Sequence, residues 1–156
     1  MDPLTALGLV GNIVQFIDFS FKLIEGARSV QKSAKGATAE DESLDDILEE
    51  LTALTSKLTQ PGFDSLQSED EATLYRLAKN CQDLSDEIRD VLKGCRATDP
   101  KSKRQRALAV AKSAFHGSKK RELKKRLDDC RSQLEMQLVY LNRFHFPTTY
   151  YQIIIS

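Results

Sequence analysis

The side chains that most often perform catalysis are scarce in this sequence. It contains two histidines, three cysteines and no tryptophan. His116 stands beside a glycine in a basic segment and His145 lies near the end, and neither belongs to an Asp/His/Ser or Cys/His constellation. Gly8 and Gly11 sit at helical positions and do not form a glycine-rich phosphate loop. We therefore expect no enzymatic activity, no small-molecule substrate and no cofactor.

The cysteines fall on the apolar stripes of two predicted helices. Cys81 and Cys95 share one stripe, and Cys130 lies on another. Their spacing matches no zinc motif, so we predict no metal site. The chain opens with Met1-Asp2-Pro3, which lacks the basic segment of a secretory signal. An odd number of cysteines without such a signal favours a reducing, cytoplasmic location, with the thiols in the core.

A run of lysines and arginines between residues 101 and 126 is interrupted by one acid, Glu122. Each positive charge near an anionic membrane leaflet contributes about 1 kcal/mol of binding free energy. Several charges on one face would thus hold a domain on a membrane. We expect such an association with the plasma membrane to be conditional. The candidate basic surface comprises Lys103, Arg104, Arg106, Lys119, Lys120, Arg121, Lys124 and Lys125.

The same charges have other interpretations. An acidic helix at residues 40–50 would be an internal partner, which leaves the bases on a solvated, partly paired face. Nucleic acid is not expected, because no aromatic side chains are interleaved as stacking platforms. Residues 1–99 hold 19 acids and 10 bases, and residues 100–156 hold 4 acids and 13 bases, a balance of −9 against +9. The two parts should therefore attract each other.

Residues 4–30 form the most apolar segment, broken only by a narrow stripe at helical spacing. The stripe consists of Gly8, Asn12, Gln15, Asp18, Lys22 and Glu25. A helix this apolar is either surrounded by other helices or meets lipid. The uncharged run at residues 3–17 has 15 residues. A bilayer requires roughly 20, so a permanent transmembrane helix is not expected.

Conditional membrane insertion and a plain core role both remain open for this helix. As a membrane-active helix, it would use its large apolar side chains. These are Leu4, Leu7, Leu9, Val10, Ile13, Val14, Phe16, Ile17, Phe19 and Phe21.

Three further segments have helical periodicity. Apolar residues recur at helical spacing over 44–58, 74–95 and 123–141, the last including Leu134, Leu138 and Leu141. Breakers occur at Gly36, Pro61-Gly62 and Asp99-Pro100, and Gly117 marks a break in the basic segment. These features predict an all-α fold, an antiparallel four- to five-helix bundle with a largely buried hydrophobic N-terminal helix. We place this domain at residues 1–143, followed by an uncharged, β-prone tail at 144–156.

The opening residues 2–19, DPLTALGLVGNIVQFIDF, resemble the start of the HeLo-like N-terminal domains of fungal NACHT and related STAND (NOD-like receptor) proteins. The segment 81–92, the run KKRELKKRL at 119–127 and RSQL at 131–134 are similar to later parts of that domain. Phe115 departs from the pattern, because many relatives have tryptophan there. The receptor's nucleotide-binding and repeat regions do not follow residue 143.

The resemblance implies a signalling bundle that acts after receptor oligomerisation in fungal non-self recognition. In several branches such a bundle kills the cell by inserting its N-terminal helix into the plasma membrane. The expected partners are further copies of the chain, an anionic membrane, and a receptor or signalling protein. The alternative is an interaction module that recruits partners to a receptor without touching lipid.

Overall fold

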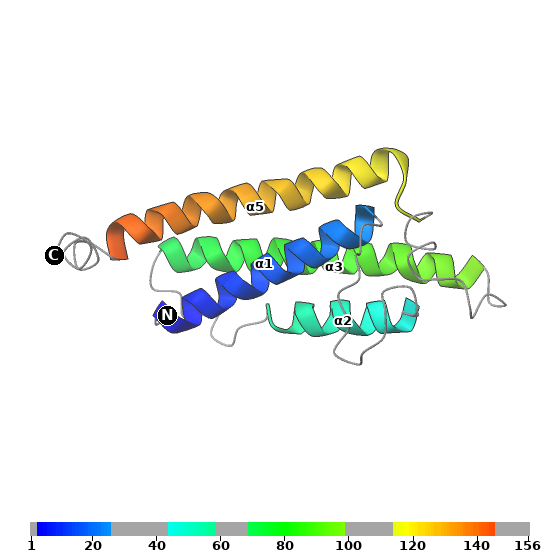
Figure 1. Ribbon diagram of the computed structural model, residues 1–156, viewed down its shortest axis with the longest axis horizontal. Coiled ribbons are helices and arrows are strands. Elements are labelled where there is room, and N and C mark those ends of the chain that lie inside the picture. Colours follow the sequence, from blue (N-terminus) through cyan, green and yellow to red (C-terminus); the bar gives the residue numbers. More distant parts are fainter. Residues whose placement is uncertain (1–2, 26–43, 59–68, 99–113, 146–156) are drawn as a thin grey trace.

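The computed structural model describes residues 3–25, 44–58, 69–98 and 114–145 (Figure 1). It contains the helices α1 (Pro3–Glu25), α2 (Leu44–Ser56), α3 (Glu69–Thr98) and α5 (Gly117–His145). All regular structure in this part of the chain is helical, which confirms the predicted all-α class. The basic residues 101–113 and the tail from 146 onward lie outside the described residues.

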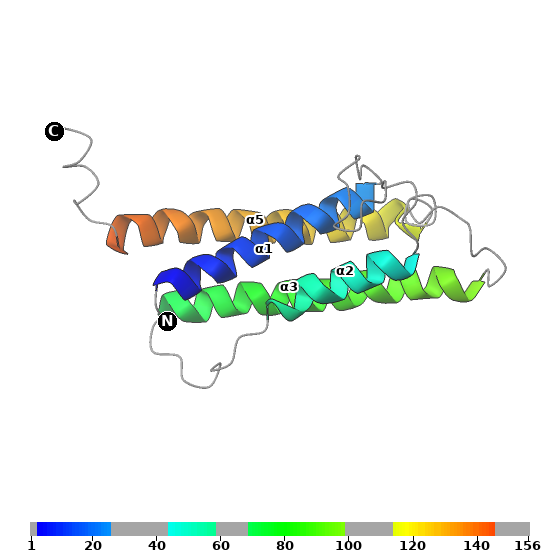
Figure 2. The same ribbon diagram turned by 60° about the horizontal axis from the view of Figure 1, so that its bottom comes forward.

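The helices alternate in direction, as expected for an antiparallel bundle. In Figure 1, α1 and α3 run one way and α2 and α5 run the other. α3 contacts α1, α2 and α5, and α1 also packs against α2 and α5. In both views α2 and α5 lie on opposite sides of the bundle (Figure 2). α1 and α3 each contact all three other helices, so these two helices together form the centre of the bundle.

The core follows the predicted stripes and is widest on α3. This helix buries the expected Leu74, Leu77, Cys81, Leu84 and Ile88, and also Tyr75, Ala78, Ser85 and Leu92. The additional residues broaden the narrow predicted stripe because α3 faces three neighbours instead of two. From α1 and α2 the core receives Leu9, Ile13, Phe16, Leu23, Ile47 and Leu51, among others.

On α5 the predicted stripe fails at one position. Leu123, Leu127, Cys130 and Leu134 are buried as expected, but Leu138 is 37% exposed and Gln137 is buried in its place. The buried positions advance by four, three and four residues up to Leu134, so the next step of three reaches residue 137. A second step of four would rotate the side chain off the buried face. Apolarity alone therefore misplaced Leu138.

The start of α5 coincides with the predicted break at Gly117. This glycine has φ of 59°, in the left-handed region that side chains with a Cβ avoid. The amide of Lys120 donates a hydrogen bond to the carbonyl of His116 at 3.3 Å, at the start of the helix. Phe115, just before the turn, is fully buried. The glycine thus redirects the chain so that α5 can lie along α1 and α3.

Candidate functional site

One face of α1 lies along α5, and two contacts set their register. Lys124 Nζ is 2.6 Å from Glu25 Oε1, and this ion pair joins the end of α1 to the early part of α5. The hydrogen bond and charge of Lys124 lower the pKa of Glu25. Two turns along α5, Arg131 places its guanidinium 4.6 Å from the centre of the Phe21 ring. Charged side chains thus cover the apolar seam between the two helices at the end where α1 stops and α5 begins.

Toward the other end of the seam the side chains are apolar and exposed. Leu7, Val14 and Phe21 are spaced by seven residues, as are Lys124, Arg131 and Leu138, so each set lies on one face of its helix. Because the helices are antiparallel, Val14 and Leu138 follow Phe21 and Arg131 along the seam. Leu7 is 64% and Val14 is 48% exposed.

The last described turns of α5 add more exposed apolar surface. Val139 and Tyr140 are exposed, and Met136 is 72% exposed. The C-terminal end of α5 and the start of α1 lie at the same end of the bundle (Figure 1). We call this set the apolar end surface, defined as Leu7, Val14, Met136, Leu138, Val139 and Tyr140. Leu138 lies on the side of α5 toward α1, whereas Met136 and Val139 lie on its outward side, so the exposed residues surround this end of α5. Exposed apolar side chains of this kind are typical of membrane or protein contacts.

The predicted membrane-active residues are divided between core and surface. The structure buries Leu9, Val10, Ile13, Phe16, Ile17 and Phe19, half-buries Phe21, and exposes Leu7 and Val14. The side chain of Leu4 lies outside the described residues. The sequence analysis missed Met136, Val139 and Tyr140. Their spacing of three and four residues, outside the leucine stripe of the same segment, was the available signal.

Among the described helices, one segment, Thr5–Glu25, is long and apolar enough to cross a membrane by length and composition alone. Half of its most apolar window is buried in the bundle, and a soluble core helix meets the same criterion.

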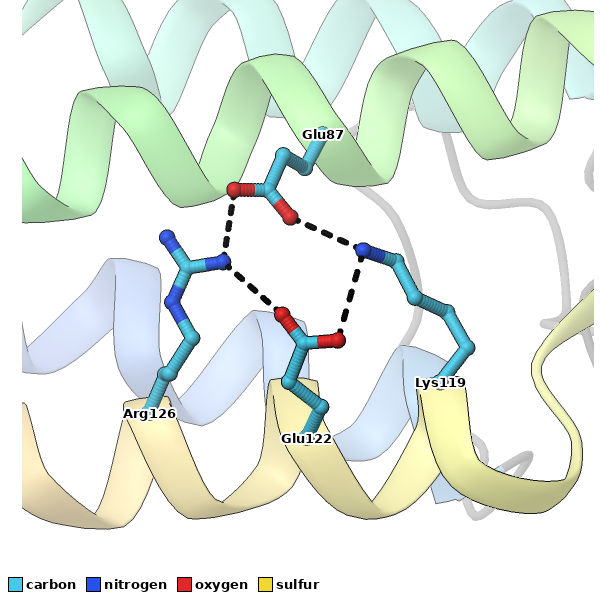
Figure 3. Close-up of polar contacts among 4 residues, drawn as sticks. All are labelled: Glu87, Lys119, Glu122 and Arg126. Atoms are coloured by element: carbon cyan, nitrogen blue, oxygen red, sulfur yellow. Dashed lines mark hydrogen bonds and ion pairs between the residues drawn. The ribbon is translucent and has the colours of Figure 1, made fainter.

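Several residues of the predicted basic surface are engaged within the bundle. Figure 3 shows Lys119 and Arg126 of α5 on either side of Glu87 of α3. Lys119 Nζ donates to Glu87 Oε2 at 3.0 Å, and Arg126 Nη1 donates to Glu87 Oε1 at 2.6 Å. Glu122 closes the ring, 3.8 Å from Lys119 and 3.5 Å from Arg126. The acid partner of these bases is thus Glu87.

The ring shifts the pKa values of two of its members, Glu87 and Arg126. Burial alone would raise the pKa of Glu87, but hydrogen bonds and charges from Arg126 and Lys119 outweigh it and lower that pKa. The hydrogen bond to Glu87 in turn raises the pKa of Arg126. Glu87 and Arg126 therefore remain ionised at neutral pH, and their ion pair links α3 to α5.

The remaining bases divide into three groups. Lys120 and Lys124 are half-buried near Glu25, and Arg121 and Lys125 are exposed. Lys103, Arg104 and Arg106 lie outside the described residues. The expected pairing with the acidic helix at 40–50 does not account for these ion pairs. Among the described residues, the bases of α5 pair with Glu25 of α1, with Glu87 of α3, and with Glu122 and Asp128 of α5 itself. The reason is topological, because α2 and α5 lie on opposite sides of the bundle.

In the described part of the chain, no group of three or more histidine, cysteine or acidic side chains is arranged to hold a metal ion. No protein-family model, curated protein or solved structure matches this sequence. The inference of function therefore depends on the surfaces described above.

Proposed function

We propose that this chain is a non-enzymatic, cytoplasmic signalling domain that attacks a membrane once several copies are brought together. In this proposal α1 leaves the bundle and inserts into the plasma membrane, as the resemblance to HeLo-like domains implies. The observation that carries the proposal is the exposure of Leu7 and Val14 on a helix whose remaining large side chains form the core. A helix that served only the core would have polar residues there.

The resting state is held by burial. Each fully buried large apolar side chain, such as Ile13 or Phe16, contributes roughly 1.5 to 3 kcal/mol. Release is therefore unfavourable for an isolated copy in water. Lipid and neighbouring copies replace the lost contacts, and clustering supplies those neighbours by mass action.

Asp18 is the main polar obstacle to insertion, with an expected cost of about 2.5 to 3.5 kcal/mol at the bilayer centre on insertion scales. In the structure, Asp18 Oδ2 lies 2.9 Å from Lys22 Nζ, one turn further along α1. A paired carboxylate enters an apolar medium with a smaller net charge than an isolated one. The pair also lies in the later half of α1, near the membrane interface if the start of the helix enters first.

The outer face of α5 fits a first contact with the membrane. Arg121 and Lys125 are exposed near its start, and Met136 and Val139 are exposed near its end. These four residues lie within one outward-facing sector of the helix, given 3.6 residues per turn. A helix lying flat on an anionic leaflet would place the bases among headgroups and the apolar residues at the acyl boundary. α1 starts beside that apolar part.

Dye leakage from anionic liposomes tests this function. Leu7→Glu and Val14→Glu put a charge on exposed positions of α1, so the fold should be retained while leakage falls at least tenfold. Ala53→Glu is the matched control, because Ala53 is exposed on α2 and gains the same charge. Circular dichroism and thermal melting verify the fold of each variant. Wild-type leakage by a folded Val14→Glu variant would refute insertion of α1.

A protein-interaction module is the second candidate, favoured by Met136, Val139 and Tyr140, which extend the apolar end surface beyond α1. Its discriminating variant is Met136→Glu. If this module is the function, the variant should abolish self-association or partner binding, and the wild-type chain should cause no liposome leakage. Leakage by the wild-type chain that is lost in Val14→Glu and only weakened in Met136→Glu, a variant of the proposed membrane-contact face, would assign the function to α1.

A further inference from the structure

Two free thiols meet inside the bundle. Cys81 on α3 and Cys130 on α5 are both buried between two helices that pack together, and each thiol shifts the pKa of the other. Their location in the core agrees with the sequence analysis, whereas their meeting was not predicted. The pair brings two nucleophilic sulfurs together across the interface between two helices.

The register of α3 and α5 supports this pairing independently. Glu87 lies opposite the segment between Lys119 and Arg126, as its two hydrogen bonds show. Cys81 precedes Glu87 by six residues, so its neighbour on the antiparallel helix lies about six residues further along α5, near Cys130. Leu77 and Leu84 on α3 and Leu127 and Leu134 on α5 are buried at the positions that the same antiparallel register pairs.

This geometry suits a disulfide. Packed helices have axes about 8 to 10 Å apart, and their Cα atoms lie about 2.3 Å from each axis. Directly facing core residues therefore bring their Cα atoms to about 3.4 to 5.4 Å, a range that overlaps the span of a disulfide. A disulfide spans Cα atoms about 4.4 to 6.8 Å apart.

The two thiols are chemically unequal. The hydrogen bond from Cys81 lowers the pKa of Cys130, the positive charge of Arg126 lowers it further, and burial opposes both. The same hydrogen bond and burial raise the pKa of Cys81, which holds its proton as the donor. Cys130 is therefore the nucleophile of the pair, because the thiolate is the reactive form of cysteine.

We propose that Cys81 and Cys130 form an oxidation site that a hydroperoxide converts to a disulfide joining α3 to α5. The Cys130 thiol first gives its proton to water, and the thiolate attacks the terminal peroxide oxygen. The O–O bond breaks, and the alkoxide takes a proton from water and leaves as an alcohol. Cys130 is then a sulfenic acid. The Cys81 sulfur attacks the Cys130 sulfur, the S–O bond breaks, and the hydroxide takes the Cys81 proton and leaves as water. In total, two thiols lose two electrons, and the hydroperoxide is reduced to an alcohol and water.

The disulfide would close a loop from residue 81 to residue 130 and restrict the unfolded chain. A loop of this size is expected to raise the melting temperature by roughly 10 °C. α1 packs against both of the joined helices, so oxidation would fix the platform on which it rests. The oxidation site does not depend on the proposed membrane function.

The test uses the full chain with Cys95→Ser, so that Cys81 and Cys130 are the remaining thiols. After treatment with hydrogen peroxide, the intact monomer should lose the mass of two hydrogen atoms and resist alkylation. A tryptic digest should contain the Cys81 and Cys130 peptides linked, and reduction should reverse the rise in melting temperature. Cys81→Ala and Cys130→Ala, in the same background, should each abolish the linked peptide and the thermal shift.

Two results would overturn the proposal. One is a folded, peroxide-treated protein in which both thiols still alkylate. The other is oxygen addition or a disulfide between two chains without the internal link. Circular dichroism before and after treatment ensures that the reaction is read on the folded bundle.

Discussion

Arg126 on α5 donates a 2.6 Å hydrogen bond from Nη1 to Oε1 of Glu87 on α3. Both side chains are about one-third exposed, with values of 36% and 35%, so water screens part of their attraction. Their importance is also geometric, because the pair fixes the register of the two long helices. The lowered pKa of Glu87 makes this relationship measurable.

Glu87→Gln should destabilise the bundle by about 1 kcal/mol at pH 7, since it removes the charge and retains an acceptor. A carboxyl whose pKa is lower in the folded state stabilises above its unfolded pKa, about 4.3 for glutamate, and loses this contribution as pH falls through the folded value. The difference in unfolding free energy between wild type and variant should therefore shrink below about pH 4.3. Urea unfolding across pH 3 to 7 measures it. A constant difference would contradict the assignment.

Thr55 and Ser85 form a hydroxyl pair between α2 and α3, with their oxygens 2.6 Å apart. Thr55 donates its own proton to the carbonyl of Leu51 at 2.6 Å, so Ser85 is the donor within the pair. Thr55→Val and Ser85→Ala should each cost about 1 kcal/mol. The double variant should cost less than the sum, because both changes remove the same bond. Additive costs would show that the pair contributes no coupling.

Ser20 is fully buried in α1, and its hydroxyl has no hydrogen-bond partner within the described residues. A buried hydroxyl without a partner carries a desolvation cost that a methyl group does not. Ser20→Ala should therefore raise the free energy of unfolding by about 0.5 to 1 kcal/mol, with a contribution from the better helix propensity of alanine. Thermal melting measures the gain. A loss of stability would mean that the hydroxyl has a partner in solution.

Phe16 and Val14 test the two sides of α1 by truncation. Phe16→Ala should cost about 3 to 5 kcal/mol, because it leaves a cavity among α1, α3 and their neighbours. Val14→Ala, at a position that is 48% exposed, should change stability by less than about 0.5 kcal/mol. Chemical denaturation compares them directly. Equal costs would contradict the orientation of α1.

The helices and most of their buried faces were predictable, because steps of three and four residues depend only on helix geometry. Leu74 to Ile88 on α3 and Ile47 to Leu58 on α2 lie where their spacing placed them. Gly117 begins α5 because a left-handed residue is needed there. These features are local, so a single sequence contains enough information to place them.

Features that depend on which helices are neighbours were not predictable from periodicity. The sequence predicted that the bases of residues 101–126 either face the acidic 40–50 segment or form one exposed surface, whereas the structure pairs Lys119 with Glu87 and Lys124 with Glu25. The sequence also predicted a helix that is apolar on most sides, and the fold leaves Leu7 and Val14 exposed at the edge of the seam between α1 and α5. The meeting of Cys81 and Cys130 likewise follows from the α3–α5 register. Predicting each of these outcomes requires knowing which helices are neighbours, and helical periodicity does not contain that information.

The contacts of α3 determine which helices would stay together if α1 left the bundle as proposed. α2 and α5 each pack on α3, so neither depends on α1 alone for its place in the bundle. The contacts of α3 with α2 and α5 would therefore remain without α1. Release of α1 would expose an apolar groove along α3, lined by the side chains that α1 had covered. That exposed apolar groove would bind other apolar surfaces, and α1 from an adjacent copy has the matching shape to occupy it.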